Sequence, residues 1–302
     1  MQIKKRQLTY LQKEGLRGYL FISPWVIGFL FFTFVPMLAS LYLAFTDYNA
    51  LSPPNFIGVD NFRRMVNMDS RRFFGSLRVT FTYVFTLVPL RLSFALLLAV
   101  VLNRGYKGIG LFRTIFYVPS LLGGSVAIAI LWRQIFGSFG LVNALLGVIG
   151  IESNTAWTNH PSTAMPIITL LGIWQFGASM LIFLAGLKQI PSSYYEAARI
   201  DGANKSSLFL RITLPCLSPV ILFNLVMQTI NAFRAFNEAF LITGGGPFDS
   251  TLFYGLFIYQ HAFIHLNMGY ASALSWVMLL IISIFAAIIF MTSSNWVYYE
   301  NK

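Results

Sequence analysis

Long runs of apolar residues, separated by short polar stretches, dominate the sequence. The hydrocarbon core of a bilayer is about 30 Å thick, so a helix that crosses it needs about 20 largely apolar residues. Several runs reach this length, although the third and fifth contain polar interruptions. We therefore expect an all-α membrane protein with six transmembrane helices, over Tyr19–Phe45, Val79–Asn103, Thr114–Gln134, Thr163–Leu187, Leu217–Ile242 and Ala271–Met291.

This pattern indicates one integral domain with a polar segment at each end. Residues 1–18 precede the first helix, residues 19–291 form the transmembrane domain, and residues 292–302 form a tail. The first apolar run is too long for the core of a signal peptide, and no small-residue cleavage site follows it. We expect it to be retained as a helix.

Four connections between the runs are long enough to matter. Three lie on one side of the expected membrane, and the second of these is expected to contain a short interfacial helix. The fourth lies on the other side and carries the most specific signals. These connections are the outer segments Thr46–Arg78, Phe136–Ser162 and Thr243–Gly269, and the inner loop Lys188–Pro215.

Composition agrees with a membrane protein. Of the 302 residues, 57% are hydrophobic and only 10% are charged, and the mean hydropathy is +0.69. A soluble protein of this length needs more charge to cover its surface. The single cysteine, Cys216, excludes an intramolecular disulfide.

The net charge of +11 is explained by how Lys and Arg are distributed between the two sides of the membrane, and it does not require a nucleic-acid partner. With six spans both termini lie on one side, and that side carries most of the 21 Lys and Arg residues. The positive-inside rule places it in the cytoplasm. The first outer loop is an exception that could serve a partner on the outer face; its arginines are Arg63, Arg64, Arg71, Arg72 and Arg78.

The inner loop carries strong helix-end signals. Ser193 and Glu196 have the spacing of a capping box, so we expect Ser193 to cap a helix of about two turns over Tyr194–Asp201. Gly202 then supplies the left-handed conformation that ends this helix.

A second helix is expected to follow. Asn204 can cap it, and we expect it to run through Phe209 and to end at Pro215. Ala197 and Ala198 leave the surface of the first helix small, so another protein could approach it closely. A solvated connector is the alternative, and sequence physics alone would favour it because capped helices are common.

The inner loop contains three short motifs, Glu196-Ala197-Ala198, Asp201-Gly202-Ala203 and Ile212-x-Leu214-Pro215. Together they resemble the EAA signature of ABC importer permeases, which lies in the same place before the penultimate span. Elsewhere the chain contains Gly18-Tyr19-Leu20-Phe21-x-x-Pro24, Arg113-x-x-Phe116-x-x-Pro119, and Leu241-x-Thr243-Gly244-Gly245-Gly246-Pro247 with Thr251. These motifs resemble the maltose-type and glycerol-phosphate-type members of that family, and the similarity covers nearly the whole chain.

The resemblance implies a MetI-like type I ABC importer permease fold and a multi-pass subunit of the cell membrane. It implies a second, homologous permease subunit, two ATPase subunits, an extracytoplasmic sugar-binding protein and a sugar substrate, with no nucleic acid. The EAA loop would be the coupling helix that docks on the ATPase. The docking residues it implies are Glu196, Ala197, Ala198, Asp201 and Gly202.

Polar residues inside the expected spans are candidates for the substrate path, because such residues are costly in a bilayer. Asn224, Gln228, Asn231 and Glu238 fall on one helical face, and Arg234 lies beside them. Amides and carboxylates suit sugar hydroxyls. The alternative is hydrogen bonding between helices, with Arg234 and Glu238 paired at i, i+4.

Arg91 lies near the middle of the second expected span, which contains no acidic residue. It either faces a central cavity or pairs with a residue such as Glu238. With Arg234 it keeps acidic oligosaccharides among the candidate substrates.

The sequence gives little support for a metal site, a catalytic site or a nucleotide-binding site. His261 and His265 have the spacing of a zinc pair but lack a third ligand, so we expect no metal site and no catalytic residue. No nucleotide-binding motif is present, so we expect ATP and Mg to be bound by the partner ATPase. The sequence predicts an importer permease for oligosaccharides, with a glycerol-phosphate-type importer and an ion-coupled carrier as alternatives and a membrane-embedded enzyme as the rival class.

Overall fold

The computed structural model describes residues 10–104 and 108–298. This part of the chain is built from helices, and its only β-type pairing is an isolated bridge between Thr46 and Phe56. It divides into two compact units. The first comprises the described residues up to Arg63 together with His261–Trp276, and the second comprises Arg64–Gln260 and the described residues from Val277.

The first unit contains the first apolar helix. α1 (Tyr10–Phe29) and α2 (Val35–Leu43) are joined by a π-helical turn at Leu30–Phe34. This wider turn precedes Pro36, whose ring would collide with a carbonyl of a regular α-turn. The continuous helix Gly18–Leu43 has a mean hydropathy of 2.1, which confirms the first expected span.

After α2 the chain forms a hydrogen-bonded corner. The buried side chain of Asn61 donates from Nδ2 to the carbonyl oxygens of Ala44 and Thr46, at 2.9 and 2.8 Å. The N–H of Gly269 donates to the carbonyl of Tyr48 at 2.8 Å. The start of the first outer loop is therefore held by hydrogen bonds that its backbone carbonyls accept.

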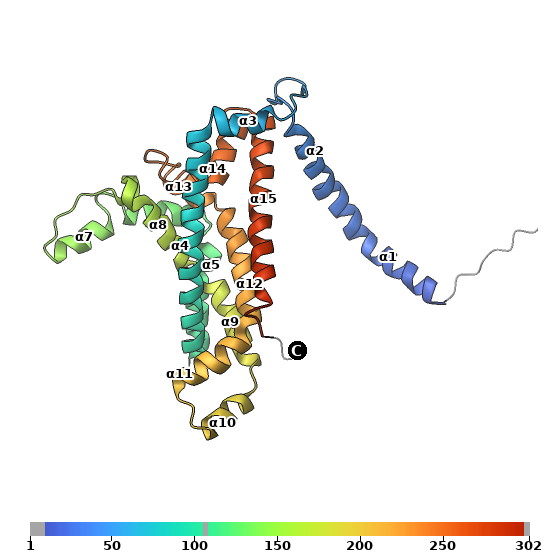
Figure 1. Cartoon of the computed structure of the whole chain (residues 1–302). Coiled ribbons are helices and arrows are strands. Elements are labelled where there is room, and N and C mark those ends of the chain that lie inside the picture. The colour runs from blue at the N-terminus through green and yellow to red at the C-terminus, as the bar shows by residue number, and fades with distance from the viewer. Residues whose placement is uncertain (1–9, 105–107, 299–302) are drawn as a thin grey trace, which may run out of the picture. The chain divides into compact units, whose positions relative to one another are not determined.

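The second unit is a bundle around one long helix, α4 (Ser70–Leu102) (Figure 1). Its buried residues recur every three or four positions, and α8, α9, α12 and α14 pack against it. α4 begins nine residues before the expected start of the second span at Val79. Arg71, Arg72 and Arg78, which we expected in a loop, are consequently helical.

The remaining helices belong to the second unit, except that α3 up to Arg63 and α15 up to Trp276 belong to the first unit. They are α3 (Asp60–Asn67), α5 (Ile109–Leu122), α6 (Val126–Ile135), α7 (Leu141–Val148), α8 (Pro161–Trp174), α9 (Gly177–Gln189), α10 (Ser192–Ile200), α11 (Lys205–Leu208), α12 (Leu214–Phe233), α13 (Asn237–Ile242), α14 (Tyr254–Tyr259) and α15 (Met268–Ser293).

Six spans result only when two bent pairs each count as one. Four helices are long and apolar enough to cross a membrane by themselves, namely Gly18–Leu43, Ser70–Leu102, Lys205–Phe233 and Met268–Ser293. α5 and α6 meet at 99°, and α8 and α9 meet at 41°. The prediction of six spans agrees with the structure when each bent pair is one span, and the third and fourth spans are then both broken helices.

The bend between α8 and α9 is held by polar groups of neighbouring helices. The carbonyl of Gln175, at the end of α8, accepts hydrogen bonds from the Arg91 guanidinium of α4 and from the Ser120 hydroxyl of α5. The Ser120 hydroxyl also accepts from the N–H of Ala178 at 3.0 Å. Such partners are what a broken helix needs in a bilayer, where water cannot satisfy its free backbone groups.

The fifth span also differs from expectation. It is continuous from Lys205 to Phe233, because a π-helical turn at Phe209–Thr213 accommodates Pro215 inside the helix. The N–H of Leu214 bonds to the carbonyl of Phe209, five residues back. The prediction that the helix ends at Pro215 was therefore wrong.

Candidate coupling helix, polar residues and outer cavity

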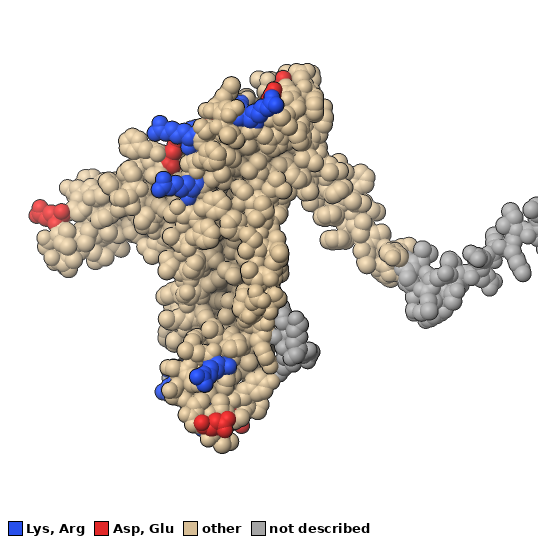
Figure 2. Space-filling model, viewed as in Figure 1, with Lys and Arg blue, Asp and Glu red and all other residues tan. Residues whose placement is uncertain are grey.

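α10 is a short helix with no buried residue, at one end of the second unit (Figure 1). The side chains of Glu196 and Ala197 are exposed, and Ala198 is half-buried. Acidic and basic side chains gather at this end, whereas the middle of the second unit shows no charge on the face drawn in Figure 2. α10 is thus presented away from the apolar part of the bundle.

The start of α10 does not use the expected capping box. The helix begins at Ser192, so Ser193 already lies inside it, and the preceding Pro191 makes no side-chain cap. Pro191 sets the entry instead, with φ −61° and ψ 135°. The prediction that Ser193 caps the helix was wrong by two positions.

The end of α10 is the stop that the sequence predicts. Gly202 has φ +79°, and its N–H bonds to the carbonyl of Arg199 at 3.1 Å. The N–H of Ala203 bonds to the carbonyl of Ala198 at 2.9 Å. These two bonds around a left-handed glycine make a Schellman motif.

α10 is connected tightly to the fifth span. Asn204 caps the next helix as predicted, because its side-chain oxygen accepts from the N–H of Ser207 at 2.8 Å. The Tyr195 hydroxyl lies 3.0 Å from the Thr213 hydroxyl of the π-helical turn. A short turn and a side-chain bond therefore join α10 to the helix that enters the bundle.

The polar residues of the fifth span do not share one environment. Asn224 and Gln228 are buried, and the Gln228 side chain donates to the Ser179 hydroxyl of α9 at 2.9 Å. Asn231 and Arg234 are exposed. Gln228 therefore joins two helices of this chain, and Asn224 bonds to the Val220 carbonyl within α12. The exposed pair is available to another molecule.

Glu238 lies outside the predicted stripe. α12 ends at Phe233, and Glu238 belongs to the separate helix α13, so the helical spacing from Asn224 does not reach it. Among the described residues there are three ion pairs, and none joins Arg234 or Arg91 to Glu238. The alternative in which Arg234 and Glu238 pair at i, i+4 is therefore not found in the described part of the chain.

Among the described residues Arg91 does not form the ion pair with Glu238 that was one of its two expected roles. Its guanidinium donates to the backbone carbonyl of Gln175, at the bend between α8 and α9. A cation at the C-terminal end of a helix is favoured by the helix dipole as well as by the hydrogen bond. This contact explains how an arginine can lie in mid-span without an acidic partner.

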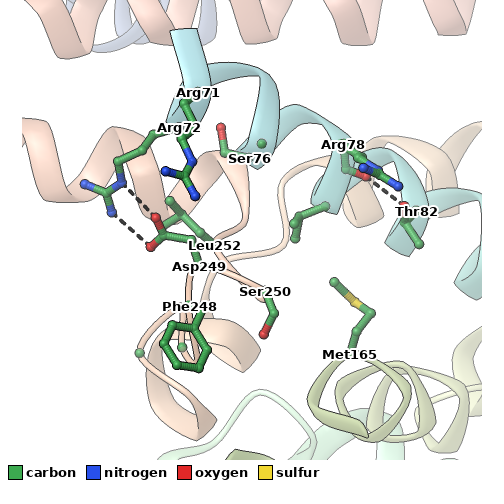
Figure 3. A pocket seen from close by; sticks show the side chains of 15 residues that line it. Arg71, Arg72, Ser76, Arg78, Thr82, Met165, Phe248, Asp249, Ser250 and Leu252 are labelled. Atoms are coloured by element: carbon green, nitrogen blue, oxygen red, sulfur yellow. Dashed lines mark hydrogen bonds and ion pairs between the residues drawn. The ribbon is translucent and has the colours of Figure 1, made fainter. Parts of the chain in front are cut away.

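A cavity of about 980 Å³, whose lining is drawn in Figure 3, lies beside the first turns of α4. In Figure 1 this end of α4 is the one away from α10. α4 forms one wall with Arg71, Gly75, Arg78 and Thr82, which follow one helical face, and with Arg72, Ser76 and Val79. The loop after α13 forms the opposite wall, and Met165 of α8 completes it. The sequence offered a signal for this site in the i, i+4, i+7, i+11 spacing along α4, but we expected Arg71 and Arg78 in a loop.

The loop wall of this cavity is fixed to α4. Arg72 donates two hydrogen bonds to the carboxylate of Asp249, at 3.0 and 3.2 Å, and a third to the Gln260 side chain at 3.0 Å. The buried Thr251 bonds through its hydroxyl to Thr243 and to the carbonyl of Gly246, both at 2.7 Å. The glycine-rich loop is thus an ordered wall of the cavity.

Comparison with known proteins identifies the relatives of this chain. Residues 65–299 match the family described as binding-protein-dependent transport system inner membrane component. The probable ABC transporter permease protein YesP of Bacillus subtilis is 55% identical, over 97% of this chain and 95% of the relative. The arabinooligosaccharides transport system permease protein AraP of the same organism is 33% identical, over 94% and 90% of the two chains.

Solved structures agree in fold. A chain of a bacterial alginate ABC transporter in complex with an alginate pentasaccharide-bound periplasmic protein superimposes with a TM-score of 0.81. It is 25% identical and covers 94% of this chain and 96% of that chain. A bacterial ABC transporter that imports the acidic polysaccharide alginate superimposes with a TM-score of 0.77 at 24% identity, covering 95% and 99% of the two chains.

Proposed function

This chain belongs to the family of binding-protein-dependent transport system inner membrane components, and on that premise we propose that it is the permease subunit of an ATP-driven oligosaccharide importer. It is a multi-pass membrane protein and a transport subunit rather than an enzyme. The observation that carries the proposal is the exposed helix α10. This helix ends in a Schellman motif, and the turn at Asn204 connects it to the fifth span.

The names of the relatives support a sugar substrate. AraP is named for arabinooligosaccharides, a 34% identical relative from Thermococcus litoralis for trehalose and maltose, and the superimposed transporter for alginate. We include acidic oligosaccharides among the substrates because Arg234 is exposed at the end of α12. A glycerol-phosphate-type importer and an ion-coupled carrier are less favoured by these relatives.

The proposed complex contains a second, homologous permease subunit, two ATPase subunits that bind ATP and Mg, and an extracytoplasmic binding protein. The alginate transporter was solved with such a binding protein. Both termini and α10 would face the cytoplasm, as the distribution of Lys and Arg predicts. This chain would bind no cofactor itself.

In the proposed mechanism α10 docks on the ATPase. Glu196, Ala197, Ala198, Asp201 and Gly202 would form the docking surface, with Glu196 paired to a basic residue of the ATPase. When ATP closes the ATPase dimer, α10 would move as a rigid body. The bonds at Asn204 and Tyr195 would carry this movement into α12 and open the path outward, and hydrolysis would reset the cycle.

The proposed substrate path includes the polar residues of the spans. The exposed Asn231 and Arg234, with the half-buried Glu238, are available to contact the sugar. Behind them, Asn224, Gln228 and Arg91 would support the wall of the path.

Reconstitution tests the proposal. Proteoliposomes with both permease subunits and the ATPase should take up an oligosaccharide only when ATP is inside and the binding protein is outside. Uptake that persists without any ATPase subunit, or with an ion gradient in its place, would contradict the proposed function.

A further inference from the structure

The cavity between α4 and the loop after α13 has two arginines without an ionic partner. Arg72 is already neutralised by Asp249, at 3.0 Å. Arg71 and Arg78 also line the cavity, and neither takes part in an ion pair among the described residues. Asp249 supplies the one carboxylate in the lining, and it is paired with Arg72. Arg71 and Arg78 therefore leave an excess of two positive charges at the cavity.

The spacing of these arginines is fixed by the helix. Arg71 and Arg78 are seven residues apart on α4, which separates them by about 10 Å along the helix axis. Figure 3 shows both side chains on the α4 wall; the dashed line beside Arg78 is the bond from the Thr82 hydroxyl to the Arg78 backbone carbonyl, which leaves the guanidinium uninvolved. Two anionic groups of one extended ligand could each meet an arginine.

The other wall suits a sugar ring. Phe248 is 95% exposed and lines the cavity from the loop that Arg72 holds. Its ring can pack on the C–H face of a pyranose. The Ser250 hydroxyl oxygen is buried in the same lining and has no hydrogen-bond partner among the described residues, so a ligand hydroxyl can supply one.

We propose that Arg71 and Arg78, with Phe248 and Ser250, form an outer binding site for the carboxylates of an acidic oligosaccharide. The volume of about 980 Å³ lies at the upper end of the range of small-molecule sites. Guanidinium groups bind carboxylates through charge-assisted hydrogen bonds. The site lies at the end of α4 opposite α10, where a sugar would enter, so this inference rests on the proposed function.

Direct binding tests the site without requiring transport. The complete transporter, in lipid nanodiscs and without its binding protein, is titrated with an alginate trisaccharide and with the neutral maltotriose. The wild type should bind the alginate trisaccharide more tightly than maltotriose. Arg71→Gln combined with Arg78→Gln should weaken alginate binding about tenfold, as expected for two partly exposed ionic contacts, and leave maltotriose binding unchanged.

Two further variants control for folding and for general charge. Arg71→Lys with Arg78→Lys keeps both charges and should retain binding within about threefold. Arg63→Gln with Arg133→Gln removes two exposed charges outside the cavity lining and should bind as the wild type does. The wild-type preference for alginate should fall in high salt, and the Arg71→Gln, Arg78→Gln variant should show little salt dependence.

Two outcomes would overturn the inference. One is equal affinity of the wild type and the Arg71→Gln, Arg78→Gln variant for the alginate trisaccharide. The other is unchanged binding of free trisaccharide with a loss of uptake of both sugars, which would make the arginines a contact for the binding protein. Failure of the proposed function is distinguishable, because the wild type would then take up neither sugar in an ATP-dependent way.

Discussion

Gly202 illustrates what a single residue contributes to the coupling helix. Its φ of +79° lies in the left-handed region, and a Cβ atom built there would meet no atom within 4 Å. A side chain would therefore act only through backbone strain, which costs about 1–2 kcal/mol. The sequence predicts this position because a glycine follows directly on a short helix with a capping residue beyond it.

Gly202→Ala should disturb the end of α10 without creating a collision. We expect lower substrate-stimulated ATPase activity in the reconstituted complex, with normal membrane insertion. Gly150→Ala is the matched control, because Gly150 has φ +83° and equally open surroundings at the far end of α7. Both variants should show a similar small loss of thermal stability, and a similar loss of ATPase stimulation in both would contradict the assignment.

Asp47 gives the first outer loop a dependence on pH. The backbone N–H of Asn55 donates to its carboxylate at 2.8 Å and the Asn55 side chain at 3.2 Å, which lowers the pKa of Asp47 below its ordinary value of 3.8. Because the pKa of Asp47 is lower in the folded state than in the unfolded state, its ionised carboxylate stabilises the fold when the pH is above the unfolded-state pKa. This stabilisation is lost as the pH falls through the folded-state pKa.

The Asn55 amide should therefore keep its protection against hydrogen exchange above pH 3.8 and lose it as the pH falls below that value, after correction for the intrinsic rate. Asp47→Asn should remove most of this pH dependence, because an amide carries no charge to titrate. Equal pH dependence in the variant would show that another group is responsible.

At the scale of secondary-structure elements, the hydropathy pattern predicts where the spans lie but not where they are broken. It locates six apolar runs, but it cannot show that the fourth run is bent by 41° between α8 and α9. A break depends on polar partners supplied by other helices, such as Arg91 and Ser120 at the carbonyl of Gln175. Those partners are distant in sequence, so their meeting follows from packing alone.

Close packing of α5 against α9 can be tested at a glycine. A Cβ atom on Gly177 would lie 2.7 Å from the Cα of Tyr117 and collide with the backbone of Phe116. Gly177→Ala should therefore destabilise the subunit by about 1–3 kcal/mol, seen as a lower unfolding temperature of the purified complex. Gly110→Ala on α5 is the control, because a Cβ atom there meets nothing within 4 Å; equal effects would contradict this packing.

The two environments within the fifth span also lead to a test. Gln228→Ala removes the bond to Ser179, and a double-mutant cycle with Ser179→Ala should give a coupling energy of about 0.6 kcal/mol. Asn231→Ala should leave stability unchanged and reduce sugar uptake, because Asn231 is exposed and belongs to the proposed path. A loss of stability in Asn231→Ala with normal uptake would reverse these assignments.

For the whole molecule, the sequence predicts the class and the coupling loop better than the interior. Apolar run lengths and the EAA motif are local properties, and the helix stop at Gly202 and the cap at Asn204 were confirmed. Burial of Asn224 and separation of Glu238 onto α13 depend on how the helices pack. The cavity at Arg71 and Arg78 depends on where α4 begins. A hydropathy pattern does not show this start, because the first turns of α4 contain charged residues.

The central claim is that α10 couples this subunit to an ATPase through an exposed acidic residue. The most direct measurement is binding-protein-stimulated ATPase activity of the reconstituted complex with Glu196→Lys, compared with Glu152→Lys at an exposed position outside α10. We expect Glu196→Lys to abolish both the stimulation and sugar uptake, and Glu152→Lys to leave them within about twofold of the wild type, as surface substitutions usually do. Wild-type stimulation and uptake in Glu196→Lys would contradict the account.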